Sequence, residues 1–263
     1  MMKANKAQQG FSLIELMIAV TLALVAMLAA TQLYASTRQT YRLQGMQTRL
    51  SEDGRFALSM LQRVIAQAGY RPSPVTPMIP TAGFMSVANG TYLTPTSNES
   101  VTVRFIADGT NMMVCDGSLA AANSQQTLTI AKSGSKLQCG TVDWIAPASA
   151  GSGTGTELVD FKILYGTDTG PATLKEFGCG ADSNATQKSR DCVADTYAQA
   201  SATAAPTAIV SVKVCLVLRT ESTDGSISKN AAVSDCGGTA IANSQTDKKL
   251  YRTFRSTVML RNQ

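Results

Sequence analysis

The sequence predicts an α+β protein in which one long N-terminal helix precedes a head built mostly of antiparallel β-strands. Three observations predict this class. An apolar run over residues 11–35 has Glu15 as its single charged side chain. An amphipathic stretch continues it without proline as far as Pro72, and alternating apolar and polar residues recur through the remaining chain. The helix should therefore come first, and the strands should form one head after it.

The apolar run over residues 11–35 is long enough to span a membrane, since about 20 apolar residues cross a bilayer. A carboxylate inside such a helix costs about 2.5–3.5 kcal/mol on insertion scales, so Glu15 requires a functional reason. An ordinary secretory signal has a shorter apolar region and an Ala-x-Ala-like cleavage site. The run contains no such site, and a plain membrane anchor does not account for Glu15.

The segment before the helix, residues 1–10, is polar and positive through Lys3 and Lys6 and ends at Gly10. With the aromatic Phe11 and with Glu15 four positions further on, it resembles the leader of a type IV prepilin. The resemblance implies that a prepilin peptidase cleaves after Gly10 and that the new amino terminus, on Phe11, is N-methylated. It also implies that Glu15 compensates the amino terminus of a neighbouring subunit during fibre assembly.

Residues 36–70 form an amphipathic stem. Apolar and small residues recur every three or four positions from Leu43 to Ala68, and Gly69 is a natural C-terminal stop. We expect one helix over residues 11–68, its second half packed on the head. Gly45 and Gly54 weaken this helix by about 1 kcal/mol each and allow a bend.

The head comprises residues 71–263. Five prolines between residues 71 and 98 predict an irregular connector there, and a Gly/Ser/Thr-rich loop is expected over residues 149–156. Alternation predicts six to nine strands in the head. The clearest candidates are residues 101–105, 127–131, 137–139, 142–145, 158–165, 208–219 and 251–261.

The chain has six cysteines, all beyond the apolar segment, and an even count in an exported domain indicates disulfides formed in an oxidising compartment. The periplasm of a Gram-negative bacterium fits. Proximity along the chain favours pairing in sequence order, although other pairings remain open. The expected pairs are Cys115 with Cys139, Cys179 with Cys192, and Cys215 with Cys236.

The sequence gives little support for catalysis. Histidine is absent, which removes His-dependent triads and His-ligated metal sites. Two Ser-x-x-Lys patterns, at Ser133 and Ser226, lie in Gly/Ser turns without the helix that such a hydrolase needs. The oxygen-rich segments 108–111 and 182–184 are interpreted as turns rather than calcium loops. We therefore predict a non-enzyme with no cofactor and no metal.

The C-terminal part of the chain is basic, but a net charge of +5 is too small to argue for nucleic acid. We interpret these cations as a solvated strand edge protected against aggregation, with a DNA-binding or partner-binding surface as the alternative. No clear nucleic-acid site follows. The residues concerned are Lys248, Lys249, Arg252, Arg255 and Arg261.

Four shorter segments, spread through the chain, are similar to the W-type minor pilins of type IV pili. They are residues 54–58, 163–166, 212–219 and 254–262. The resemblance implies a pilin-like fold and a low-abundance subunit that joins other minor pilins and the major pilin. Such a subunit primes assembly at the inner membrane, where its helix spans the membrane once and carries a periplasmic head. It then lies at the fibre tip on the cell surface. A tip adhesin is a further partner there.

Two other functions remain open at this point. The J-type minor pseudopilin of type II secretion shares the leader and a similar head. A membrane-anchored adhesin or DNA-binding module belongs to a different class, and it would use the head to hold a surface ligand. Genomic neighbourhood separates the first alternative from a pilus subunit, and the residues themselves give no support to the second.

Overall fold

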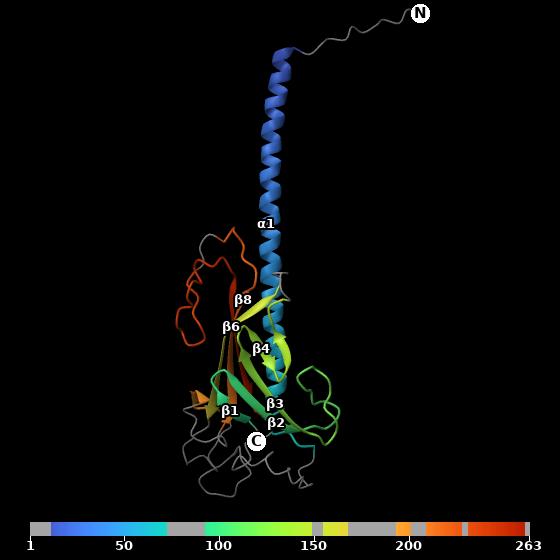
Figure 1. Cartoon of the computed structure of the whole chain (residues 1–263), viewed down its shortest axis with the longest axis vertical. Coiled ribbons are helices and arrows are strands. Elements are labelled where there is room, and N and C mark those ends of the chain that lie inside the picture. The colour runs from blue at the N-terminus through green and yellow to red at the C-terminus, as the bar shows by residue number, and fades with distance from the viewer. Residues whose placement is uncertain are drawn as a thin grey trace, which may run out of the picture. The chain divides into compact units, whose positions relative to one another are not determined.

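The computed structural model describes residues 12–72, 93–148, 155–167, 193–200, 209–227 and 231–260. These residues form one long helix and nine strands in two sheets (Figure 1). The chain divides into two compact units, Met1–Met46 and Gln47–Gln263. The α+β class expected from the sequence is confirmed.

The helix α1 (Leu13–Ala66) contributes to both units. In the first unit, every described side chain from residue 12 to residue 42 is exposed, and this part is long and apolar enough to cross a membrane. In the second unit, α1 buries an apolar stripe that includes Leu50, Leu61 and Ile65. The helix ends in a turn at Gly69, whose φ of 75° suits glycine.

The first sheet is antiparallel throughout, with its strands in sequence order. Its centre is the long pairing of β2 with β3, in which Ser100 lies opposite Ala131 and Ile106 opposite Gln125. A tight hairpin joins β3 to β4, as the Ser-Gly-Ser turn predicts. The strands are β1 (Leu93–Ser97), β2 (Ser100–Ile106), β3 (Gln125–Ser133), β4 (Lys136–Cys139) and β5 (Val142–Ile145).

The expectation of an irregular connector over residues 71–98 is wrong at its end, where β1 forms. Pro95 lies within this strand and pairs with Val101, and the register shifts between Pro95 and Ser97. Proline cannot donate to a ladder, but β1 is the edge of its sheet, so its second side needs no donor. Residues 73–92 of the expected connector lie outside the described part of the chain.

The second sheet has the strand order β7-β6-β8-β9 and is also antiparallel. Its two long strands pair over almost their whole length, with a register shift near Asp160. The short strand β7 was not predicted, because three residues give too little alternation to read. The strands are β6 (Thr156–Thr167), β7 (Thr196–Ala198), β8 (Ile209–Thr220) and β9 (Tyr251–Met259).

One core joins the two sheets to the part of α1 that belongs to the second unit. Phe105 and Ile130 enter it from the first sheet, and Phe161 and Leu216 enter it from the second. Such fully buried side chains each contribute about 1.5–3 kcal/mol relative to exposure.

Backbone hydrogen bonds also link the two sheets. The strand β7 pairs with β6 only between Tyr165 and Thr167, which leaves the rest of that edge of β6 open to other partners. Further along the same strand, Ile163 donates its N–H to the Asn98 carbonyl at 2.9 Å, and Leu158 donates to Ser135 at 2.8 Å. Turns of the first sheet thus satisfy β6 backbone groups that would otherwise lack partners.

Candidate functional site

Glu15 lies in the first turn of α1, among apolar side chains that are all exposed. Its neighbours Ile14, Leu16 and Ile18 have 66%, 60% and 54% of their surface exposed. A soluble protein rarely presents a continuous apolar surface of this kind, which marks contact with lipid or with other subunits. Within the described residues, the Glu15 carboxylate has no hydrogen bond and no ion pair.

The threonine hydroxyl groups between residues 12 and 37 are satisfied within the helix itself. Thr21 and Thr31 each donate to the carbonyl three residues earlier at 2.9 Å, and Thr37 donates to Leu33 at 2.8 Å. A polar group in hydrocarbon needs such an internal partner. Glu15 is therefore the one charged side chain between residues 12 and 37 whose partner must come from elsewhere.

A strand of the head runs along the second half of α1. Gln62 donates from Nε2 to the Ser256 hydroxyl at 2.7 Å, and Arg252 donates to the Ser51 hydroxyl. Between these two contacts, the Phe254 ring covers Gly54 so closely that a Cβ on Gly54 would overlap the ring atoms. We expected Gly54 to weaken the helix and to allow a bend, whereas in the structure its lack of a side chain makes room for the aromatic ring.

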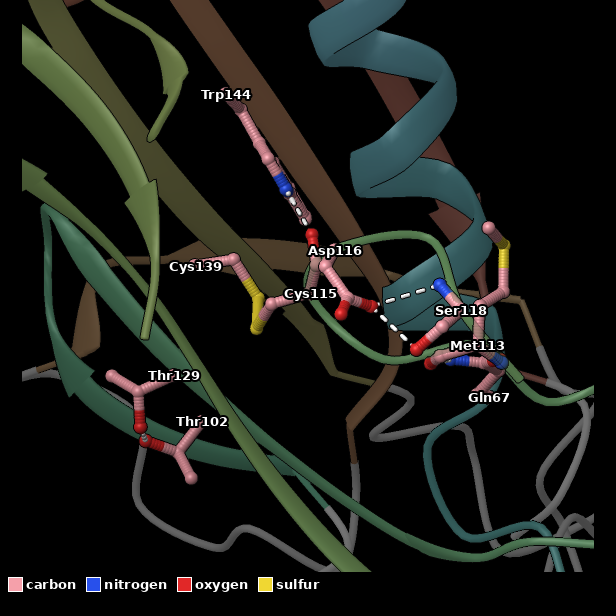
Figure 2. The surroundings of a disulfide bond; sticks show 9 residues. All are labelled: Gln67, Thr102, Met113, Cys115, Asp116, Ser118, Thr129, Cys139 and Trp144. Atoms are coloured by element: carbon pink, nitrogen blue, oxygen red, sulfur yellow. Dashed lines mark hydrogen bonds between the residues drawn. A yellow bond between two sulfur atoms is a disulfide. The ribbon is translucent and has the colours of Figure 1, made fainter. Parts of the chain in front are cut away.

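The Gln67 side chain joins the end of the stem to the first disulfide loop. Its Oε1 accepts the backbone N–H of Met113 at 2.6 Å, and its Nε2 donates to the Met113 carbonyl at 3.1 Å. Gln67 is only 6% exposed, so both polar atoms are buried and both are satisfied. The side-chain amide thereby binds both backbone groups of Met113, as a neighbouring β-strand would, and fixes the loop (Figure 2). Sequence reasoning missed this residue, because a glutamine at a helix end carries no pattern.

The first disulfide, between Cys115 and Cys139, ties this loop to β4. The Trp144 indole N–H donates to the Cys115 carbonyl at 2.8 Å, and the Asp116 carboxylate accepts the Ser118 N–H (Figure 2). Cys139 is fully buried, so the bond belongs to the core. The loop is therefore held by the stem, by the disulfide and by the indole together.

The second disulfide, between Cys215 and Cys236, ties the loop before β9 to β8. The buried Asp160 carboxylate accepts the Cys236 N–H at 2.8 Å. Lys162 Nζ lies 3.7 Å from an Asp235 oxygen on the same loop. Sequence order predicts both observed disulfides. The third expected pair, Cys179 with Cys192, lies outside the described residues, as do Gly10 and Phe11.

The two disulfide loops share one turn. In each loop the cysteine lies two positions before a glycine of positive φ, 83° at Gly117 and 88° at Gly238, a conformation that favours glycine. In both loops this glycine donates its N–H to the carbonyl three residues earlier, at 3.0 Å and 3.2 Å. The repeated Cys-x-Gly signal was available in the sequence and was not used. The equivalent antiparallel bridges are Met113 with Leu119 and Ser234 with Ala240.

Ion pairs connect the start of β9 with β6 and β8. Glu157 pairs with Arg219 and, at 3.1 Å, with Lys249. The Tyr251 hydroxyl donates to the Asp247 carboxylate. Burial is the largest cause that raises the pKa of Tyr251 above its ordinary value, and this hydrogen bond is the second. Lys249 therefore belongs to a half-buried ion cluster, and interpreting it as part of a solvated edge was wrong.

The other cations of the C-terminal part differ in surroundings. Lys248 and Arg255 are exposed, as expected for a solvated strand, whereas Arg252 contacts the stem through Ser51. Arg261 lies outside the described residues. The basic character of this part of the sequence therefore comes from groups with separate structural roles.

The segments considered for catalysis or calcium have local roles where they are described. The backbone N–H groups of Asn111 and Thr110 donate to Asp108 at 2.8 and 2.9 Å and hold the pKa of this carboxyl below its usual range. The segment is thus a turn, as interpreted. Ser133 and Lys136 face each other across the β3–β4 hairpin, where Lys136 pairs with Asp143 at 2.6 Å.

The comparisons with known proteins agree with this geometry. The family model described as prokaryotic N-terminal methylation motif matches residues 5–31, and that of type IV pilus-assembly protein W matches residues 122–262. A methylation motif on a long apolar helix that leads into a β-rich head defines a pilin-like protein. Since the second match covers more than half of the chain, the protein belongs to the type IV pilus-assembly protein W family.

Among solved structures, a type IV-like pilin from Thermus thermophilus is similar to this chain with 14% sequence identity. The match covers 81% of this chain and 98% of the Thermus chain, with a TM-score of 0.43. No curated protein of similar sequence was found.

Proposed function

We propose that this protein is a minor pilin that primes type IV pilus assembly at the inner membrane together with other minor pilins, and that it lies at the fibre tip. The observation that carries the proposal is the apolar half of α1, exposed throughout and charged only at Glu15 between residues 12 and 37. This surface needs a membrane before assembly and neighbouring helices after it. The family match supplies the pilus context.

In this proposal, each part of the chain has its own compartment and partners. The apolar helix is held in the inner membrane, and the head lies in the periplasm, where an oxidising environment forms Cys115–Cys139 and Cys215–Cys236. Prepilin peptidase is the first partner, since the methylation motif, residues 5–31, includes the end of the leader. Other minor pilins and the major pilin are the later partners, and a tip adhesin is a further one.

Deleting the gene is expected to reduce surface pili strongly and to leave type II secretion unchanged. The reason is that a priming subunit limits the start of each fibre, whereas the secretion system assembles its own pseudopilins. Electron microscopy of pili and an assay of a secreted enzyme measure the two outcomes. Lost secretion with normal pili would instead identify a J-type pseudopilin, and complementation with the intact gene is the control.

The mature chain is expected to begin at Phe11 and to carry a methyl group on its amino nitrogen. The basis is the Lys3/Lys6 leader that ends at Gly10 before an apolar helix, and the matched motif, residues 5–31, includes Gly10 and Phe11. Mass spectrometry of the N-terminal peptide from purified membranes measures this directly. A chain that starts at Met1, or one cut after Ala30 as by a signal peptidase, would contradict it.

A further inference from the structure

A groove of about 600 Å³ lies over three strands of the second sheet, β6, β8 and β9. Its lining includes one cation from each of three adjacent strands, Lys162 of β6, Lys213 of β8 and Arg255 of β9. The strand register explains this arrangement. Lys162 and Arg255 both lie opposite Cys215, and Lys213 lies opposite Leu164 one row away.

Within the described part of the chain, a carboxylate partner is present for only one of the three cations that line the groove. Lys162 Nζ lies 3.7 Å from Asp235, and Lys213 Nζ lies 3.5 Å from the centre of the Tyr197 ring. Arg255 is exposed and forms no ion pair with any described residue. Among the described residues, the three lining cations thus have one carboxylate in an ion pair with them, that of Asp235, so a negatively charged occupant is favoured.

Paired strands and a disulfide hold the groove in place. Its floor is three paired strands, and the Cys215–Cys236 disulfide fixes the loop at one end. The buried hydrogen bond from the Cys236 N–H to Asp160 holds this loop a second time. A preformed site of this kind loses little conformational entropy when it binds a ligand.

We propose that this groove binds a short acidic peptide segment from the head of a partner pilin, with its carboxylates on Lys213 and Arg255. That the segment belongs to a partner pilin rests on the proposed function. That it is acidic rests on the cations that line the groove. A volume near 600 Å³ falls within the usual range for compact ligands. Single-stranded nucleic acid fits less well, because it is held over about 4–16 nucleotides with bases stacked on aromatic rings. Among the described residues, no aromatic side chain lines the groove.

The test measures binding of a fluorescein-labelled decapeptide of alternating glutamate and threonine to the full-length protein in detergent, by fluorescence anisotropy. We expect saturable binding that weakens with salt. The double substitution Lys213→Glu and Arg255→Glu should weaken it at least about tenfold, since two attractions become repulsions. The neutral variant Lys213→Gln with Arg255→Gln should give an intermediate loss and guards against a folding defect.

The matched control reverses two exposed cations outside the groove, Arg55→Glu with Lys248→Glu, and should bind the peptide as the parent does. Equal loss in this control, or no binding of the acidic peptide by the parent, overturns the proposal. So does tighter binding of a single-stranded decanucleotide, which would indicate a nucleic-acid site instead. Normal piliation of the deletion strain would reject the proposed function while leaving the peptide result intact, so the two failures are distinguishable.

Discussion

Replacing Glu15 with alanine is expected to leave a processed, membrane-inserted protein with a folded head that no longer enters the fibre. In α1, this carboxylate has no partner among the described residues and is surrounded by exposed apolar side chains. Its proposed partner is the amino terminus of a neighbouring subunit, in a setting that water does not reach. The substitution therefore leaves the chain itself intact and removes an interaction between chains.

The expected size follows from the cost of leaving one charge of a buried pair without its partner. That cost is about 3–5 kcal/mol, and each 1.4 kcal/mol is about tenfold in affinity. Association with other pilins should thus fall at least about 100-fold, measured by co-purification with a tagged minor pilin from detergent-solubilised membranes. The same membranes, analysed by mass spectrometry, show whether cleavage still occurs.

The matched control is Glu52→Ala, which removes an exposed carboxylate of the same helix from its second half. It should leave association unchanged. If Glu15→Ala also leaves association unchanged, charge compensation at this position is wrong. If Glu15→Ala instead prevents membrane insertion, the carboxylate acts before assembly.

Most of the fold was predictable, because its elements carry strong periodic signals. The alternation of Val212, Val214 and Leu216 in β8 places each of them in the core. Continuous apolar and amphipathic patterns likewise predicted α1 to within two residues at each end. The strand β1 was missed because Pro95 disfavours a strand in general, and only its edge position makes it acceptable.

Of the candidate functional residues, some are indicated by the sequence pattern and others only by the fold. Glu15 is conspicuous in the sequence, because one charge in an apolar run has a known energetic cost. Gln67 and the groove cations are not conspicuous, since their roles depend on which chain segments the fold brings together. Lys162 and Arg255 are far apart in sequence and share a row only through the register of β6, β8 and β9. No local pattern contains that information.

The stem also carries a packing requirement that helix propensity alone would misjudge. Replacing a helical glycine with a residue of higher propensity usually stabilises the helix by about 1 kcal/mol. At Gly54 the Phe254 ring already occupies the space that a Cβ would take, so any side chain there must displace the ring. The ring is itself part of the packing around the core, between the contacts of Arg252 and Ser256 with the stem.

Substituting Gly54→Leu is therefore expected to destabilise the head by about 1–3 kcal/mol, the usual cost of overpacking. The melting temperature should fall by about 2–4 °C for each kcal/mol in a domain of this size. Near-ultraviolet circular dichroism of the full-length protein in detergent follows the loss of head packing.

Gly45→Leu is the matched control, since no heavy atom lies within 4 Å of the position that a Cβ would take there, and it should not lower the melting temperature. The double variant Gly54→Leu with Phe254→Ala should recover part of the loss, whereas equal instability of both control and test would show that the ring is not the cause.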